Sequence, residues 1–325
     1  MAGRRVTIYA AIAANVAIAI TKFIAAAGGS TAMLAEALHS VVDTGDGLLL
    51  LLGLYLSRRP PSRRHPYGHG AEIYFWSLVV AMSIFGMGGG VSIFEGIDHL
   101  RSPVPLGSAT LSYAVLGTAF VFEGASWLVA RRAFRRIRGS RPIWEAIKRS
   151  KDPTTFMVLL EDSAALVGIA IAGAGIALAH HFDAPALDAI ASILIGTLLV
   201  AMAIIVGRET WSLLLGEAAD HELVESVQRI ARAQDGVTGV ELPRTMHLGP
   251  ELVHVDLELF VDASRSAREL IDTCRSIEAE LRARHKEIHR VSFRFPDGSP
   301  SGRGDRPSTD QRAQSEPPPP DSADR

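Results

Sequence analysis

Residues 32–56 read AMLAEALHSVVDTGDGLLLLLGLYL, and they decide the fold because they place ionisable side chains inside a stretch long enough to cross a membrane. A hydrocarbon core about 30 Å thick needs about 20 mostly apolar residues in a helix. His39, Asp43 and Asp46 are spaced four and three residues apart, so they share one face of that helix. Ionisable groups inside a bilayer are costly and usually functional. The segment therefore predicts a membrane helix that carries a polar site.

The whole chain has the composition of a membrane protein with a soluble part. Of its 325 residues, 48% are hydrophobic and 21% are charged, and the mean hydropathy is +0.20. Charges are sparse in 6–57 and 71–130 and dense in 131–151 and 217–325, which excludes a single soluble globule. One cysteine, Cys274, excludes a disulfide framework. The formal net charge of −2 gives no support for nucleic acid binding.

Six apolar segments separated by turn residues are predicted to be membrane helices: 6–27, 32–56, 73–99, 108–130, 154–179 and 186–213. Lysine and arginine in short loops mark the cytoplasmic side of a membrane. Basic residues precede the first segment and follow the second and fourth, whereas the alternate loops hold only Arg101. We therefore expect a multi-pass protein in contact with membrane lipids, in a bacterial inner or plasma membrane, with both termini cytoplasmic.

After residue 216 the sequence has the pattern of a small soluble α+β domain. The spacing of apolar residues predicts helix, strand, helix and strand at 222–233, 253–261, 266–284 and 291–295. The residues expected to face inward on the second helix are Leu270, Cys274, Ile277 and Leu281. We therefore divide the chain into a membrane domain at 1–216, a cytoplasmic domain at 217–297 and a proline-rich, disordered tail at 298–325.

The fifth segment carries two further acidic residues, Glu161 and Asp162. At about 1.5 Å per residue, Asp43 and Asp162 both reach the middle of a core about 30 Å thick. Carboxylates and an imidazole that meet there need a compensating cation, and this donor set suits a divalent transition metal such as zinc. His39, Asp43 and Asp162 are therefore candidate metal ligands. A proton relay or a buried polar lock between helices is the alternative.

The loop after the second segment, RRHPYGHGAE at 63–72, holds a second candidate site. His65 and His69 stand near two glycines and offer two imidazoles to a metal, whereas a basic loop that binds anionic lipid is the alternative. The stretch GMGGG at 86–90 contains a GxxxG spacing, which is typical of close helix packing. Lys22 and Glu123 are predicted to be interhelical hydrogen-bonding residues or interface anchors.

The stretch LAEALHSVVD at 34–43 and the loop HPYGHG at 65–70 resemble the cation diffusion facilitator family. The resemblance extends to about residue 297, and residues 161–166 (EDSAAL) resemble the branch that includes zinc transporter 9. It implies a homodimeric antiporter that exchanges a divalent metal for protons, with a ferredoxin-like cytoplasmic domain. Zinc is the expected cargo, with iron, cobalt or manganese as alternatives, and a non-transporting metal sensor or scaffold is a further alternative.

The family's transport site uses an H/D-xxx-D pair on the second span and another on the fifth. His39 and Asp43 match the first pair. On the fifth span Asp162 matches, but the position of its partner holds Val158, which cannot ligate a metal. Glu161, beside Asp162, is therefore the expected replacement ligand.

Proton coupling follows from the chemistry of such ligands. They must be deprotonated to bind a metal, so metal and protons compete for one site. Asp46 stands where relatives commonly carry Asn, and we expect it to add an oxygen donor or to carry a proton. No enzymatic activity is expected: an intramembrane hydrolase built on His39 and Asp43 lacks a suitably placed Ser or Cys nucleophile and an HExxH motif.

The family's accessory metal sites lack some of their usual ligands in this sequence. The loop site of relatives pairs an Asp with the two histidines, and here that position is Ser62. In the cytoplasmic domain Asp256 occupies a position that is often His, and Arg294 stands where a ligating His is usual. Since an arginine cannot bind a metal, we expect this domain to serve dimerisation, with at most a weaker site at His247, His254 and Asp256.

Overall fold

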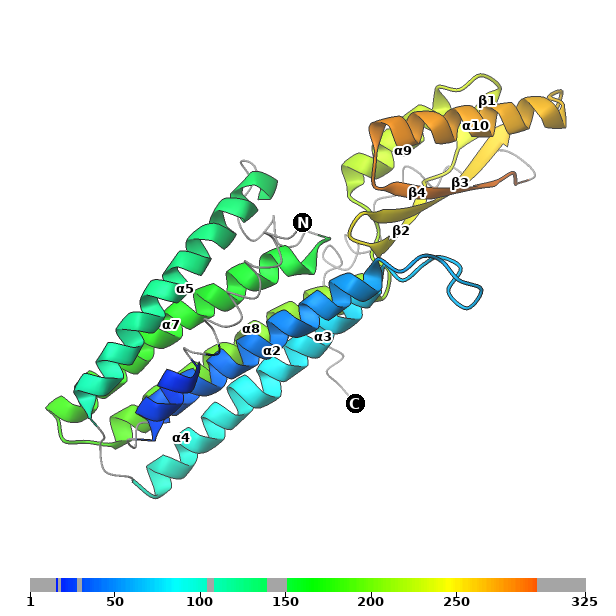
Figure 1. The fold of residues 1–325 in the computed structure, drawn as a ribbon. Helices are drawn as coiled ribbons and strands as arrows, with labels where there is room; N and C mark the ends of the chain where they lie inside the picture. Colours follow the sequence, from blue (N-terminus) through cyan, green and yellow to red (C-terminus); the bar gives the residue numbers. More distant parts are fainter. Residues whose placement is uncertain (1–15, 17–18, 28–30, 104–107, 139–150, 297–325) are drawn as a thin grey trace, which may run out of the picture. The chain divides into compact units, whose positions relative to one another are not determined.

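The computed structural model describes residues 16, 19–27, 31–103, 108–138 and 151–296 (Figure 1). The contacts within the chain divide it into two compact units, one of residues 1–217 with 247–250 and the other of residues 218–246 with 251–325. The first unit holds the long helices, and the second holds most of a small sheet with its helices. The predicted tail at 298–325 lies outside the described residues.

The first unit is helical, and its helices follow a helical stretch at 19–26. They are α2 (Thr31–Ser57), α3 (Glu72–Ser83), the π-helix η1 (Ile84–Gly90), α4 (Val91–Arg101), α5 (Ala109–Arg138), α7 (Pro153–His181) and α8 (Ala186–Leu214). Five spans among the described residues are long and apolar enough to cross a membrane: Met33–Ser57, Glu72–Arg101, Ala109–Arg132, Phe156–His181 and Ala186–Leu214. The predicted polytopic helical fold is confirmed, and most of the remaining predicted span, 6–27, lies outside the described residues.

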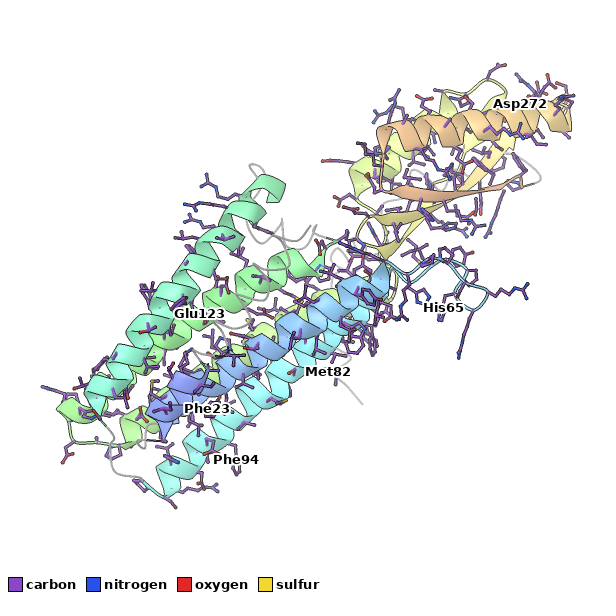
Figure 2. The ribbon with its side chains drawn as sticks, viewed as in Figure 1. Phe23, His65, Met82, Phe94, Glu123 and Asp272 are labelled. Atoms are coloured by element: carbon purple, nitrogen blue, oxygen red, sulfur yellow. The ribbon has the colours of Figure 1, made fainter. Side chains whose placement is uncertain are left out.

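The helices pack side by side, with α8 against α3, α4 and α7, and α5 against α7 (Figure 1). Buried apolar side chains such as Ile84, Met157 and Leu199 fill the interior. The outer surface is apolar as well: Met82 and Phe94 are more than half exposed (Figure 2). An outward apolar surface is expected where lipid tails, which are as apolar as leucine, surround the helices.

Small residues let η1 and α8 approach closely. A Cβ atom on Gly89 would lie 2.9 Å from the carbonyl oxygen of Gly196, and a Cβ on Gly196 would lie 2.7 Å from that of Gly89. The packing role predicted for the glycine-rich stretch is thus observed, but at Gly89 and not at the Gly86 and Gly90 pair. A Cβ on Gly86 would meet nothing within 4 Å, because this residue faces away from α8.

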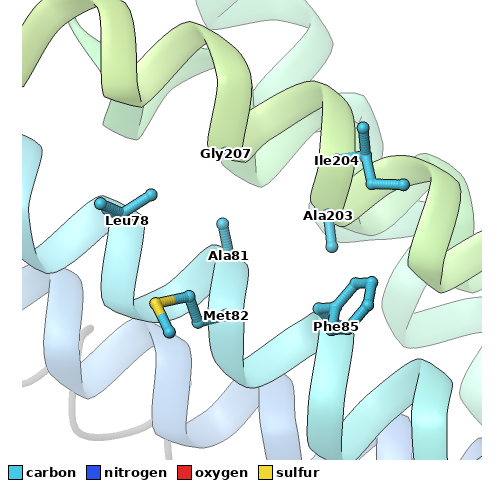
Figure 3. Close-up of a pocket in the computed structure, with 7 residues that line it drawn as sticks. All are labelled: Leu78, Ala81, Met82, Phe85, Ala203, Ile204 and Gly207. Atoms are coloured by element: carbon cyan, nitrogen blue, oxygen red, sulfur yellow. The ribbon is translucent and has the colours of Figure 1, made fainter.

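A pocket of about 230 Å³ lies where α3 and η1 face α8 (Figure 3). It is lined by Leu78, Ala81, Met82, Phe85, Ala203, Ile204 and Gly207. All of these residues are apolar or glycine, so the pocket suits an apolar group and not a cation.

The helix α5 ends later than the sequence predicts. It continues to Arg138, eight residues beyond the expected end at 130, and includes arginines that the sequence pattern assigns to a loop. Cations near a helix C-terminus interact favourably with the helix dipole, which favours this extension. The guanidinium of Arg131 also lies over the ring of Trp127, 5.0 Å from its centre.

The second unit is the predicted α+β domain. Its elements are α9 (His221–Arg232), β1 (Val237–Val240), the first half of β2 (Arg244–Gly249), β3 (Leu252–Val261), α10 (Ala267–Arg284) and β4 (Ile288–Arg294). The long strand β3 is central: it pairs with β2, antiparallel with β1 (Val240 opposite Leu259) and parallel with β4 (Glu258 opposite Arg294). The α9 and α10 helices cover one face of the sheet (Figure 1).

The core of this unit lies under those helices. Alternate residues of β3, namely Val253, Val255, Leu257 and Leu259, are fully buried, as the strand pattern predicts. On α10, Ile277 and Leu281 are buried as predicted, whereas Leu270 and Cys274, which share their helical stripe, are half-buried. The buried contacts of α10 fall in its second half. Helical spacing alone could not show where the covered sheet ends.

Candidate metal centre

One face of α2 carries buried polar side chains near the middle of the helix. His39 and Asp46 are at most 1% exposed, and Asp43 is 17% exposed in its side chain. The Nδ1 atom of His39 lies 3.3 Å from Oδ1 of Asp43, one helical turn away. The other ring nitrogen of His39, Nε2, is buried and makes no hydrogen bond to any described residue. An imidazole nitrogen and a carboxylate are thus held together in an apolar setting.

The acidic residues of α7 are also buried but have different neighbours. Asp162 accepts a 2.8 Å hydrogen bond from the Ser126 hydroxyl of α5. Glu161 lies within electrostatic range of Asp43 and Asp46 of α2, and its Oε1 atom is buried with no hydrogen-bond partner in the described part of the chain. Of the two α7 carboxylates, that of Asp162 is thus held by a hydrogen bond, whereas Oε1 of Glu161 has no such partner among the described residues.

Val158, the position that lacks a ligand, faces outward. It is 37% exposed, although it lies one turn before the buried Asp162 on α7. A longer polar side chain at this position would begin at the surface of the unit. Glu161 and Asp162, by contrast, are both buried.

His39 and Asp43 form a pair on α2, whereas Glu161 and Asp162 are consecutive residues of α7. Among the described residues, no three His, Cys, Asp or Glu side chains lie close enough together to hold one metal ion. The α2 and α7 helices do contact each other. The complete ligand set, with Asp46 as an added donor, therefore stays a prediction.

Sequence reasoning missed an ionised group next to this face. Glu36 is fully buried, and its Oε2 atom pairs with Nζ of Lys22, which is fully buried as well, at 3.1 Å. Lys22 had been predicted as an interhelical link, and it is one. The signal for Glu36 was present, since it is a carboxylate inside an apolar span three residues before His39.

The loop before α3 brings its two histidines together. The rings of His65 and His69 are 4.4 Å apart between centres, and Nδ1 of His69 lies 3.8 Å from Oε1 of Glu72. The hydroxyl of Ser62 accepts a 3.1 Å hydrogen bond from the backbone N–H of His65 and so closes the turn. Figure 2 labels His65 on this largely exposed loop. The predicted metal binding here stays a prediction.

In the second unit, ion pairs occupy the carboxylates of β3. A guanidinium nitrogen of Arg294 lies 3.1 Å from Oδ2 of Asp256, and the other lies 3.9 Å from Glu258. Arg244 of β2 approaches the same Glu258 carboxylate at 3.4 Å. An arginine therefore holds the carboxylate that was a candidate ligand.

Comparison with known proteins places both parts of the chain. Residues 8–215 match the family model of the cation efflux transmembrane domain, and residues 219–292 match that of the cation efflux protein cytoplasmic domain. The chain is 35% identical to metal tolerance protein C4 of Arabidopsis thaliana over 68% of its own length and 49% of that protein.

It is also 31% identical to the human mitochondrial proton-coupled zinc antiporter SLC30A9 over 75% of its length and 43% of that protein. It is 24% identical to the manganese efflux system protein MneP of Bacillus subtilis over 89% of its own length and 94% of that protein. The chain thus spans less than half the length of the first two of these relatives. The resemblance seen in the sequence is confirmed, and the chain belongs to the cation efflux family, also called the cation diffusion facilitators.

Proposed function

We propose that this protein moves a divalent metal cation, zinc, across a membrane in exchange for protons. The observation that carries the proposal is the buried face of α2, where His39 and Asp43 lie 3.3 Å apart and Nε2 of His39 has no hydrogen-bond partner among the described residues. A buried nitrogen acceptor beside a carboxylate suits a transition metal. Family membership supports metal transport as the activity.

Glu161 and Asp162 supply the second half of the proposed site. The Oε1 atom of Glu161 is a buried acceptor without a hydrogen-bond partner among the described residues, and an unsatisfied buried acceptor is costly unless something compensates it. A cation between α2 and α7 would compensate it. Among the described residues these side chains do not form one cluster of three ligands, so we propose that α2 and α7 shift relative to each other when the cation binds, as in the rocking that alternating access uses.

Zinc is proposed over other metals on the ligand types and on similarity. An imidazole with carboxylates suits zinc, and SLC30A9 is named as a proton-coupled zinc antiporter. MneP is named as a manganese efflux protein, so manganese is the second candidate cargo. Carboxylate-rich sites suit manganese, and the two α7 carboxylates favour it. We further propose that the chain works as a homodimer through the α+β domain.

Metal flux into sealed vesicles tests the proposal. Purified protein in proteoliposomes that contain a zinc-sensitive dye should admit zinc, and Asp43→Asn should stop the flux. Manganese uptake in the same vesicles, measured with a manganese-quenched dye, compares the two cargoes. Equal dye signals in vesicles with and without protein would contradict transport and would favour a metal sensor or scaffold.

A further inference from the structure

A fully buried ion pair joins the helical stretch at 19–26 to α2. Nζ of Lys22 lies 3.1 Å from Oε2 of Glu36 and donates a 2.7 Å hydrogen bond to the hydroxyl of Ser40. Neither charged side chain is exposed to any degree. A buried ion pair is weak support for stability, because both charges lose their hydration on burial. We therefore expect this ion pair to have a function other than stabilising the contact between the helices.

The second carboxylate oxygen of Glu36, Oε1, is buried and makes no hydrogen bond to any residue that the structure describes. It faces Gly168 of α7, where a Cβ atom would collide with it. A glycine thus leaves room for this oxygen, and Glu36 stands where α2, α7 and the stretch that carries Lys22 meet.

This junction lies on one side of the candidate metal centre. Glu36 precedes Asp43 by seven residues on the same face of α2, which is about 10 Å along the axis. Gly168 follows Asp162 by six residues, about 9 Å along α7. Both displacements point to the end of the helices at which α2 begins and α7 ends (Figure 1). The carboxylate therefore lies between the candidate centre and that end.

We propose that the carboxylate of Glu36 is a second, transient binding site for the transported divalent cation. The ammonium of Lys22 occupies this site between transport cycles. This inference rests on the proposed function. A divalent cation that leaves His39 and Asp43 for the near end of α2 meets Glu36, and its double charge displaces the singly charged ammonium. Ser40 still accepts a hydrogen bond from Lys22 during the exchange. Return of the ammonium then restores the ion pair and releases the cation. The positive charge is in excess while both cations are near Glu36, so this state is short-lived and the cation passes on.

A pure structural link between helices is the competing explanation, and a double substitution separates the two. Replacing a buried ion pair by apolar residues of similar volume is often neutral or stabilising. Lys22→Met with Glu36→Met therefore keeps a packed junction and removes the proposed transient binding site. Glu36→Gln is a second variant that keeps the shape of the side chain and removes its charge.

Two glycines of α7 provide a matched pair of steric variants. In Gly168→Ala the new methyl pushes the Glu36 carboxylate aside without changing any charge, and it makes an ordinary contact of 3.9 Å with Ile195. In Gly173→Ala, on the same helix, the methyl would make an ordinary contact of 3.9 Å with Leu116. Zinc flux in proteoliposomes, zinc affinity in detergent and the melting temperature are measured for each.

We expect the double variant to fold and to bind zinc as tightly as the unchanged protein, because His39 and Asp43 are intact. Its maximal zinc flux should fall about tenfold or more, the effect of losing one charged contact. Gly168→Ala should slow the flux in the same way, and Gly173→Ala should not. A folded double variant with unchanged flux overturns the inference, and so does unchanged flux in Glu36→Gln if the double variant does not fold. Failure of the unchanged protein to move zinc would instead contradict the proposed function.

Discussion

In the small α+β unit, a guanidinium nitrogen of Arg294 lies 3.1 Å from the carboxylate of Asp256 on the neighbouring strand. The parallel register of β3 and β4 places Glu258 opposite Arg294, so the arginine reaches both acidic residues of β3. A metal at Asp256 would have to displace a cation that is charged at every physiological pH. This geometry favours a domain whose structure does not depend on a bound metal.

The first prediction is that metal removal leaves this domain unchanged. Treatment with EDTA should not shift the dimer–monomer equilibrium of the full chain in detergent, measured by light scattering. Asp256→Ala, His247→Ala and His254→Ala should each leave zinc flux close to the unchanged rate.

Arg294→His provides the control, because it restores a ligand type and removes the fixed charge. Dimerisation of this variant should become sensitive to EDTA. A large loss of flux in Asp256→Ala that still dimerises would contradict the prediction and would indicate a working metal sensor.

The second prediction concerns the pair on α2. His39→Ala and Asp43→Ala should each abolish zinc flux in proteoliposomes, because each removes one of two side chains that lie 3.3 Å apart at the buried centre. Expression level and dimerisation should be retained, since neither residue belongs to the apolar core.

Ser192→Ala is a matched control for these variants. Ser192 is a buried polar residue of α8 that donates a 2.9 Å hydrogen bond to the backbone oxygen of Ser92 on α4. It should transport normally. Near-normal flux in either α2 variant would show that the cation uses another path.

Much of this arrangement could be predicted from the sequence, because apolar length and helical spacing are local properties. The span that holds His39 and Asp43 and the alternating strand at 253–261 are both found as expected. The π-helix at Ile84–Gly90 and the partner of Glu36 could not be predicted. They depend on which face of one helix packs against another helix. The spacing of apolar residues along the sequence does not show this.

The third prediction tests whether Glu161 replaces the missing ligand. Glu161→Gln removes the charge but keeps the shape of a buried side chain whose Oε1 atom has no partner among the described residues. Zinc affinity should fall by about tenfold or more, as for the loss of one charged contact. Isothermal titration of the purified protein measures it.

Two further variants test which other positions of α7 can ligate the metal. Asp162→Asn, which keeps a group able to bond with Ser126, should lower affinity as well if both carboxylates ligate. Val158→His should change metal selectivity only if α7 can rotate, because this position is 37% exposed. Unchanged affinity in Glu161→Gln would mean that Asp46 or water completes the site.

The last prediction concerns the coupling of metal to protons. Imidazole and carboxylate ligands bind a metal only when deprotonated, so zinc binding must release protons and must weaken as the pH falls. Zinc affinity should drop by about tenfold per pH unit for each proton released, over the range in which the ligands titrate. Zinc entry into vesicles should therefore be accompanied by proton exit, seen as a rise in internal pH with a pH-sensitive dye. Asp43→Asn should remove the zinc-dependent pH change and the zinc flux together. Zinc flux that continues without any pH change, at a rate independent of an imposed pH gradient, would contradict antiport and would leave a passive path for the metal.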